Sequence, residues 1–284
     1  MGPLMPAYET SAPIAASVDV PSGRIRVTAT ERTDTVVEVR PSNELSDKDV
    51  QAAEETQVEY VRGRLTVRAP KSWLRSLIGP TASIDVDIAL PAGSALTVST
   101  WGDCTCEGRL GDVAVESAAG SLRIEHAAGL RAKTAAGDIA VGRIDGRGDV
   151  DAAVGAVWMD EVAGPTVAKV SSGGVTVGEV TADLRLHGAY GDIRVDRVLA
   201  TVGAKTAYGS VRVGEAVRSA IVLDTGHGDL EVGIAAGTAA WLDVSSKYGV
   251  VRSALDATGE PPADGETVEI RARTQYGDVI VRRA

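Results

Sequence analysis

Phenylalanine is absent from this sequence of 284 residues, and aromatic residues of all kinds make up only 4% of it. A hydrophobic core must therefore be built from Val, Ile, Leu and Ala. Only two cysteines occur, Cys104 and Cys106, which excludes a framework of disulfide bonds. Long apolar runs are missing too, as is a basic segment followed by an apolar one. We therefore expect no membrane span and no signal peptide, and a cytoplasmic location.

Basic residues are in the minority: 29 Lys and Arg stand against 39 Asp and Glu, giving a net charge of −10. This balance argues against a broad phosphate-binding surface, and so against nucleic acid as a partner. Otherwise the composition is that of a globular protein, with 44% hydrophobic and 24% charged residues. The 32 glycines are the exception, and they imply many turns.

Glycines recur at intervals of about 18 residues through the later two thirds of the sequence. Apolar residues stand two and four positions after most of these glycines, as Ile193 and Val195 do after Gly191. A second alternating strand precedes each glycine, for example at Val202 and Ala204. Both patterns are typical of half-buried strands. The recurring glycines are Gly102, Gly120, Gly137, Gly155, Gly173, Gly191, Gly209, Gly228, Gly249 and Gly277.

This repeat predicts an all-β fold, a single-stranded parallel β-helix (β-solenoid) of about ten coils over residues 96–284. Neither half of a coil buries its own apolar face, so each coil needs its neighbours. A β-sandwich is the alternative fold, but it would not place the same residue type in the same column of every repeat. Residues 256–265 are predicted to form a loop inserted before the last coil.

Residues 1–95 lack the repeat and are predicted to be a β-rich capping region that covers the strand edges of the first coil. One short helix is expected over Ser46–Glu55, with Ser46 as its cap, and one loop over Pro70–Thr81. The expected strands are Val18–Val20, Ile25–Ala29, Val36–Arg40, Val58–Arg62, Leu65–Ala69 and Ile84–Leu90.

The repeated GDI-V and GDL-V phrases, with LPAGS at Leu90–Ser94, resemble a bacterial adhesin-like β-solenoid family of unknown function. The SDKDVQAAEET segment and the closing TQYGDVIV also stand in family-like places, so the resemblance covers most of the chain. It implies a single-stranded β-helix with no established catalytic activity. Many members carry a membrane or secretion segment, and this sequence departs from them in showing none.

In a solenoid each sequence column becomes a ladder of neighbouring side chains. The residue before the glycine is a ring in five late coils: Tyr190, Tyr208, His227, Tyr248 and Tyr276. These rings are either a stacking platform for a carbohydrate or a partner's aromatic residues, or a structural corner whose rings pack on one another. The alternation of the strand places this column toward the interior, which favours the structural interpretation.

Three outward-facing residues are further candidates for a partner surface. Arg194 and Arg212 are expected to form a local patch for an anion or an acidic partner, or else a solvated face. Trp158 is the large apolar residue that looks most exposed.

Two other columns predict structure rather than a site. Asp residues after the glycines are expected to form turns, since no two acidic members of the column belong to consecutive repeats and calcium needs converging ligands. Charges four positions before the glycine alternate in sign from coil to coil, which predicts ion pairs that fix the register.

Nothing in the sequence forms a recognisable catalytic or metal-binding motif. Cys104 and Cys106 occupy core positions of one strand, and the three histidines fall in different columns without a nucleophile beside them. The coils are also nearly uniform in length, so few long loops are available to form the cleft that a polysaccharide-active β-helix needs. We therefore predict no cofactor, no metal and no enzyme.

The sequence thus predicts a non-catalytic interaction or scaffold protein, a rigid β-solenoid that presents ladders of side chains to a protein partner. The alternatives are a filament assembled end to end, or a carbohydrate-binding module using the Tyr190–Tyr276 corner. A monomer or small oligomer is expected, because Arg282 and Arg283 follow the last apolar strand, Val279–Val281, and would guard it against pairing.

Overall fold

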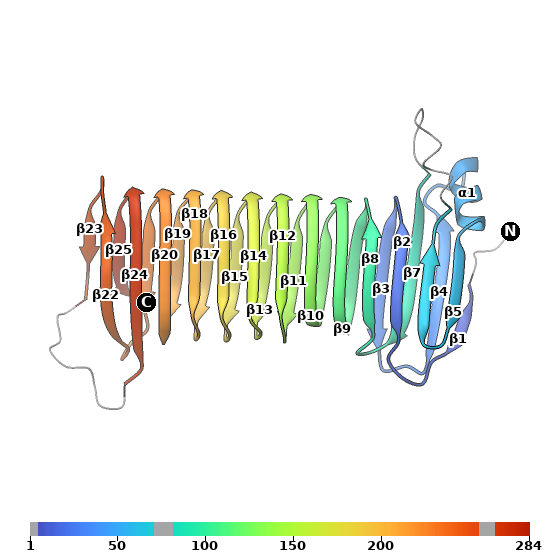
Figure 1. Ribbon diagram of the computed structural model, residues 1–284, viewed down its shortest axis with the longest axis horizontal. Helices are drawn as coiled ribbons and strands as arrows, with labels where there is room; N and C mark the ends of the chain where they lie inside the picture. The colour runs from blue at the N-terminus through green and yellow to red at the C-terminus, as the bar shows by residue number, and fades with distance from the viewer. Residues whose placement is uncertain (1–4, 71–81, 256–264) are drawn as a thin grey trace. The chain divides into compact units, whose positions relative to one another are not determined.

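The computed structural model describes residues 5–70, 82–255 and 265–284 (Figure 1). The chain divides into two compact units, Met1–Ala140 and Val141–Ala284. Strands make up almost all the regular structure, and the described residues contain a single helix. The all-β solenoid predicted from the repeat is confirmed.

The second unit is a stack of coils, each of which contributes one strand to each of two parallel sheets. β12 (Gly148–Val154) pairs in parallel with β14 (Thr166–Ser172), while β13 (Val157–Val162) pairs with β15 (Val175–Val180). The same pattern continues through β16 (Leu184–Tyr190), β17 (Ile193–Val198), β18 (Val202–Tyr208) and β19 (Val211–Ala216); β11 (Ile139–Ile144) crosses the boundary between the units.

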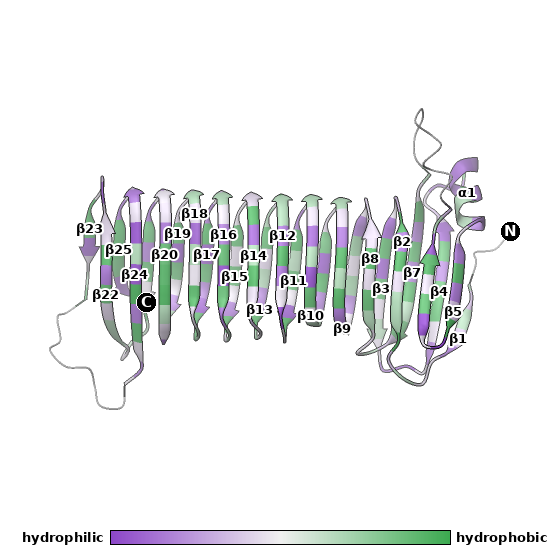
Figure 2. Ribbon diagram, in the orientation of Figure 1, coloured by the Kyte–Doolittle hydropathy of each residue, from purple (hydrophilic) through white to green (hydrophobic). Residues whose placement is uncertain are grey.

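Apolar and polar residues alternate along these strands, as the bands of Figure 2 show. The inward column of one sheet contains Ile193, Val211 and Leu230, which stand in register and are buried. Stacking therefore produces a continuous core of aliphatic side chains, which explains how the protein folds with no phenylalanine.

The corners between strands require glycine. Gly191 has a φ of 139°, and a Cβ atom placed on it would lie 2.1 Å from the carbonyl oxygen of Gly173 in the preceding coil. Only a residue without a side chain fits both the backbone conformation and this approach. The regular glycine spacing in the sequence reflects this stack of corners.

Buried hydroxyl groups satisfy the backbone at the same corners. Thr225 donates from its Oγ1 to the carbonyl oxygen of Gly209 at 2.9 Å, and Thr274 donates in the same way to Gly228 at 3.0 Å. Among the described residues no buried side-chain nitrogen or oxygen lacks a hydrogen-bond partner. A Thr three positions before a corner glycine thus keeps the carbonyl of the neighbouring corner satisfied inside the core.

The coils at the C-terminal end of the second unit do not stack in sequence order. β24 (Thr267–Tyr276) lies between β20 (Ser219–His227) and β22 (Ala239–Ser246). Likewise β25 (Val279–Arg283) lies between β21 (Leu230–Ile234) and β23 (Val251–Ser253). The end of the stack is therefore formed by residues 239–253, which we call the terminal coil.

The prediction that Val279–Val281 is the last strand, guarded by Arg282 and Arg283, is consequently wrong. Arg282 forms an ion pair with Glu231 at 2.9 Å, and Arg283 donates to the carbonyl oxygen of Thr238 at 2.9 Å. Both arginines hold β25 to the neighbouring coil.

The first unit also contains a coil that is displaced from sequence order. β2 (Ala15–Val20) lies between β6 (Arg64–Arg68) and β8 (Ala95–Thr100), and β3 (Arg24–Thr30) pairs with β7 (Ile84–Pro91) and β9 (Asp103–Ala119). Residues 15–30 are thus a coil of the solenoid. The predicted boundary at residue 95 does not separate two groups of strands, because β2 and β3 pair with strands on its other side.

Antiparallel strands cover the other side of this unit. β4 (Asp34–Pro41) pairs antiparallel with β7 and with β1 (Ala7–Glu9), and β5 (Gln57–Val61) pairs antiparallel with β6. The predicted helix is confirmed as α1 (Asp47–Glu54), whose cap Ser46 accepts a hydrogen bond from the backbone nitrogen of Asp49. β10 (Leu122–Ala136) pairs in parallel with β9. Most of the predicted loops 70–81 and 256–265 lies outside the described residues.

Candidate functional site

Five rings in the second unit form one continuous stack, which we call the aromatic ladder: Tyr190, Tyr208, His227, Tyr276 and Tyr248, in spatial order. Successive ring centroids lie 5.1, 4.8, 4.6 and 4.8 Å apart, and the interplanar angles are 4°, 4°, 1° and 16°. The spacing equals that of neighbouring strands, so the coils themselves set the stack. The order differs from the sequence because the Tyr276 coil is inserted before the Tyr248 coil.

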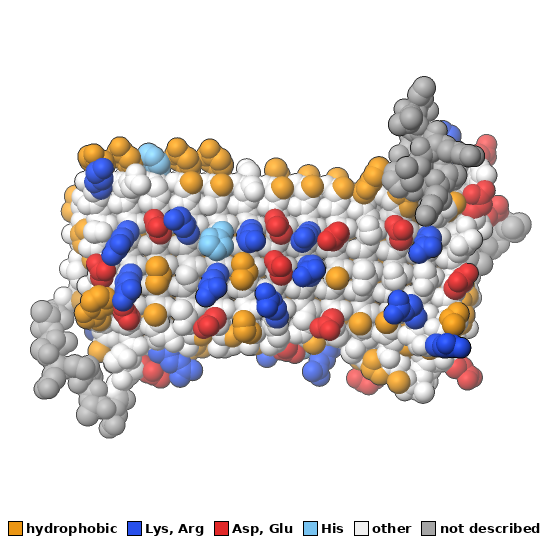
Figure 3. Space-filling view, viewed as in Figure 1, with side chains coloured by type: hydrophobic (Ala, Val, Ile, Leu, Met, Phe, Trp, Pro, Cys, Tyr) orange, Lys and Arg blue, Asp and Glu red, His pale blue; other side chains and the backbone are white. Residues whose placement is uncertain are grey.

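The aromatic ladder lies on the surface, and the predicted inward orientation is wrong. Its tyrosines are between 47% and 59% exposed, and a row of apolar side chains interrupted by a histidine follows one edge of the molecule in Figure 3. The turn at each corner glycine breaks the strand alternation on which the prediction rested. The hydroxyl of Ser or Thr two residues earlier is the last inward group before the corner.

Parallel stacking determines what the aromatic ladder offers to another molecule. Each inner ring has both faces against its neighbours, so the ring rims and the phenolic oxygens face solvent. Among the described residues the hydroxyl groups of the four tyrosines form no hydrogen bond. At the end of the stack the ammonium group of Lys247 lies 5.1 Å from the centroid of the Tyr248 ring.

The aspartates after the corner glycines bind backbone of the next coil. Asp192 accepts from the backbone nitrogen of Ser210 at 2.8 Å, and Asp229 accepts from that of Asp278 at 2.8 Å. Asp229 and Asp278 thus belong to adjacent coils, which the sequence order concealed. The described residues contain no cluster of three His, Cys, Asp or Glu side chains able to hold a metal ion.

The predicted outward residues Trp158, Arg194 and Arg212 share one column of the second sheet, with Thr176 between the first two. Trp158 is exposed. Arg194 forms an ion pair with Asp196 at 2.6 Å, and Arg212 pairs with Glu231, which also binds Arg282. Acidic partners within the protein therefore already neutralise both predicted arginines.

Glu231 is the most strongly held of these carboxylates. Burial alone would raise its pKa, but the hydrogen bonds from Arg282 and Arg212 outweigh this effect and hold the pKa below its usual value. The alternating charges four positions before the glycines also pair as predicted, for example Lys205 with Asp224 at 3.4 Å. Exposed pairs of this kind each contribute about 0–1 kcal/mol, so they specify register more than stability.

Cys104 and Cys106 are buried core residues, with their sulfur atoms 3.9 Å apart. The hydrogen bond to Cys104, together with burial, raises the pKa of Cys106 far above its usual value. Neither thiol is poised as a nucleophile. His187 lies in register between Lys169 and Lys205, and His227 is part of the aromatic ladder.

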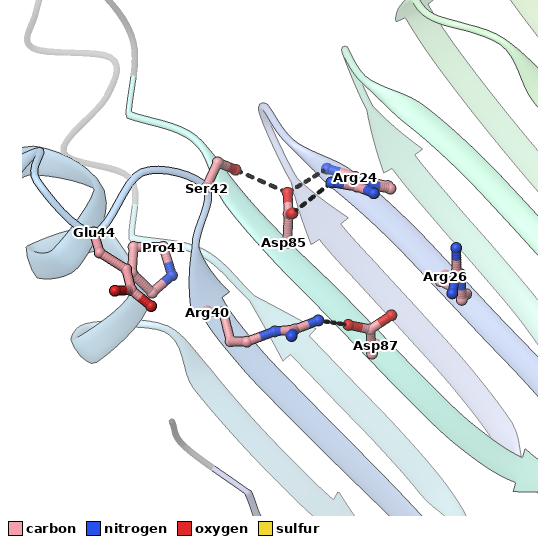
Figure 4. A pocket seen from close by; sticks show the side chains of 8 residues that line it. All are labelled: Arg24, Arg26, Arg40, Pro41, Ser42, Glu44, Asp85 and Asp87. Carbon is pink, nitrogen blue, oxygen red and sulfur yellow. Dashed lines mark hydrogen bonds and ion pairs between the residues drawn. The ribbon is translucent and has the colours of Figure 1, made fainter. Parts of the chain in front are cut away.

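A pocket of about 460 Å³ in the first unit was not predicted from the sequence (Figure 4). Asp85 accepts hydrogen bonds from Arg24 at 3.0 Å and from the Ser42 hydroxyl at 2.8 Å, while Arg40 binds Asp87. Its charges largely neutralise one another, and neither His nor Cys lines it. It is lined by Arg24, Arg26, Arg40, Pro41, Ser42, Glu44, Asp85 and Asp87.

No helix in the described part of the chain is long and apolar enough to span a membrane. Among curated proteins, none matches this chain. Solved structures that match it include a “putative adhesin” of Bacteroides fragilis, at 12% identity and a TM-score of 0.40, with 99% of this chain and 97% of that one covered. A “putative lipid binding protein” of Parabacteroides distasonis matches at 13% identity and a TM-score of 0.47, with the same coverage.

The family comparison covers nearly the whole chain. The model of the Toastrack DUF4097 family, a domain of unknown function, matches residues 14–282. That range includes the displaced coil of residues 15–30 and residues 267–282 of the inserted coil, as well as the regular repeats. With both displaced coils and the whole repeat within the match, the chain belongs to the Toastrack DUF4097 family.

Proposed function

We propose that this protein is a non-catalytic interaction module that binds a partner protein along the aromatic ladder. The observation that supports the proposal is the exposure of five stacked rings on one edge of a solenoid whose other large apolar side chains are mostly buried. Exposed tyrosines are costly to leave in water, and they are enriched at the centres of protein interfaces.

The geometry of the aromatic ladder favours a protein partner over a carbohydrate. A sugar stacks on the face of a ring, but the faces of Tyr208, His227 and Tyr276 are covered by their neighbours at 4.6–5.1 Å. What remains is a ridge of ring rims, which carry partial positive charge, and phenolic hydroxyl groups. Backbone carbonyl groups and apolar side chains of a protein chain complement such a ridge.

The arrangement of charged residues supports a non-catalytic role. Carboxylates in the outward columns bind arginines or backbone nitrogens, as Glu231 and Asp192 do. The pocket of the first unit is lined by three arginines and three acidic residues. A general acid or base needs a group whose pKa is tuned toward neutrality, whereas the hydrogen bonds from Arg282 and Arg212 hold the pKa of Glu231 below its usual value. The cytoplasmic location inferred from the sequence stays a prediction.

A photocrosslinking amino acid at position 208 tests the proposal in cells that produce the protein. We expect a protein adduct with the probe at position 208 and none with the probe at Val222, which is similarly exposed on the face of the solenoid. Replacing Tyr190 and Tyr276 with Ala should abolish the adduct and leave the far-UV circular dichroism unchanged.

Two outcomes would contradict the proposal. Absence of any adduct specific to position 208 would favour the structural interpretation, in which Tyr208→Ala costs only the two stacking contacts, each about 0.5–1.5 kcal/mol. Binding on a glycan array that Tyr208→Ala and Tyr248→Ala abolish, with folding intact, would support the carbohydrate alternative.

A further inference from the structure

Among the described residues, nothing covers the hydrophobic core at the terminal coil, which forms one end of the stack. Leu242 and Val244 are half-buried, whereas Ile270 and Ala272, their register partners in the next coil, are buried. Val251 is 42% exposed, although its register partner Val279 is fully buried. In the terminal coil, therefore, solvent reaches side chains whose counterparts in all the remaining coils of this unit face the core.

Both strands of the terminal coil also have an open edge. Within the described residues, β22 pairs only with β24, and β23 pairs only with β25. Natural proteins protect such edges with lysines, prolines or bulges. β22 and β23 contain neither lysine nor proline, and their two charges are engaged inward: Asp243 with Arg273 at 3.2 Å and Arg252 with Asp278 at 3.7 Å.

The corner of this coil lacks the acidic side chain of the neighbouring corners, and its one charge is that of Lys247. Val250 occupies the column in which Asp192, Asp229 and Asp278 use their carboxylates to bind the next coil, and it is exposed. A valine cannot bind backbone in that way, but it can pack against an apolar surface. Tyr248 is exposed at the same corner, and Trp241 is exposed near the start of β22. Together these residues form an apolar end with two unpaired strand edges.

We infer that the terminal coil binds the terminal coil of a second copy of this chain, end to end, in a two-fold symmetric dimer. A single peptide strand would cover one edge and leave half of the open core in water. A second terminal coil has the same cross-section and covers both edges and the core together. The interface shares Tyr248 with the aromatic ladder and leaves the other four rings, on the side of the stack, to the ladder's proposed partner.

Charge selects the relative orientation of the two copies. β22 and β23 run in opposite directions on the two sheets (Figure 1). A two-fold axis can therefore pair the terminal coils of two copies in two ways, both with antiparallel strands. Pairing β22 with its own counterpart places Asp243 of both copies on one edge and Arg252 of both on the other. Pairing β22 with β23 of the second copy places Asp243 of one copy on the same edge as Arg252 of the other, which has the opposite charge. The second arrangement is favoured, and it brings the corner at Tyr248 beside its counterpart.

A dimer rather than a filament follows from the symmetry of the contact. Each copy has one terminal coil, and the two-fold contact uses that coil completely. The isologous contact is closed and ends at two copies.

Sedimentation velocity of the full chain over a wide range of concentration tests the inference. We expect a species of twice the chain mass of 29.3 kDa. Val250→Lys and Val251→Lys should each weaken the dimer by about tenfold or more, since each buries a charge in the interface. Val222→Lys is the matched control, because Val222 is 45% exposed on the face of an inner coil and should leave the dimer intact. Thermal unfolding of each variant separates lost association from lost folding.

Cysteine crosslinking tests the orientation. Tyr248→Cys should form a disulfide-linked dimer under mild oxidation, whereas Tyr208→Cys, in the middle of the aromatic ladder, should not. A wild-type monomer at all concentrations, or open-ended growth beyond two copies, would overturn the inference. Equal dissociation by Val222→Lys and Val251→Lys would do so as well. Failure of Tyr248→Cys to crosslink a confirmed dimer would overturn the proposed orientation. Loss of the adduct at position 208 would bear on the proposed function alone.

Discussion

The corner glycine Gly191 allows the packing of the solenoid to be tested with one methyl group. Replacing it with Ala forces a side chain into a backbone conformation with a φ of 139° and sets its Cβ 2.1 Å from the carbonyl oxygen of Gly173. A non-glycine residue in this region costs about 1–3 kcal/mol. Separating the two coils to relieve the contact also weakens the hydrogen bond from the Gly173 nitrogen to the carbonyl oxygen of Tyr190, now 2.8 Å, which is worth about 0.5–1.5 kcal/mol.

We therefore expect Gly191→Ala to lower the free energy of unfolding by about 2–4 kcal/mol. Gly203→Ala is the matched control: Gly203 lies within β18, has no positive φ, and has no atom within 4 Å of an added Cβ. Because Ala loses less chain entropy than Gly, this variant should be neutral or more stable by up to about 1 kcal/mol.

Urea denaturation followed by circular dichroism measures both variants. Hydrogen exchange should show that Gly191→Ala loosens the coils on either side of residue 191 first, because each coil contacts only its neighbours. Equal stability of Gly191→Ala and Gly203→Ala would refute the steric explanation of the corners.

Two other predictions concern ionisable groups. In the folded protein the pKa of Glu231 is below its usual value of 4.5, so its ion pairs stabilise the fold at pH values above the unfolded pKa. This stabilisation is lost as the pH falls through the pKa of the folded state, and Glu231→Gln should therefore reduce the loss of stability in acid. Urea denaturation at a series of pH values measures this effect, and an unchanged pH profile would contradict the prediction. Cys104 and Cys106 should react with a thiol reagent only as fast as the protein opens, so rapid labelling of the native protein would show that the core there is accessible.

The repeat made the solenoid predictable because its two signals come from two physical requirements. Alternation at positions such as Val202 and Ala204 reports which side chains enter the core, and the glycine reports the corner at which adjacent coils nearly touch. Each requirement recurs in every coil, so chance agreement is excluded after a few repeats.

The spatial order of the coils was not predictable from the same signals. Nothing in a periodic pattern states which coil lies beside which. The clues lay in departures of the Gly249 coil from the pattern: Val250 replaces the aspartate or serine that the other late coils carry in its column, and Trp241 stands at an outward position. The corner at Gly23 was hidden for a different reason, since β4, α1 and β5, which lack the repeat, stand in the sequence between its coil and the next corner glycine, Gly102.

The sequence identified the rings of the aromatic ladder as one column, but it placed them toward the core, whereas they lie on the surface. Sequence alternation assigns Tyr208 to the interior because it continues the inward parity of Val202, Ala204 and Thr206. The corner glycine that follows rotates the chain, so the last residue before it points outward. Parity holds only while the backbone remains extended, and a backbone with positive φ ends it.

The insertion of β24 and β25 between earlier strands has a consequence for synthesis on the ribosome. As the chain emerges, residues 239–253 meet an exposed coil at β20 and β21, but their native neighbour, residues 267–283, has yet to be made. Direct docking of the early segment would build a stack in the wrong order, because it would occupy the place of β24 and β25. Completion of the native fold therefore cannot proceed one coil at a time from the start of the chain, and the last step requires two coils to dock in reverse order of their translation.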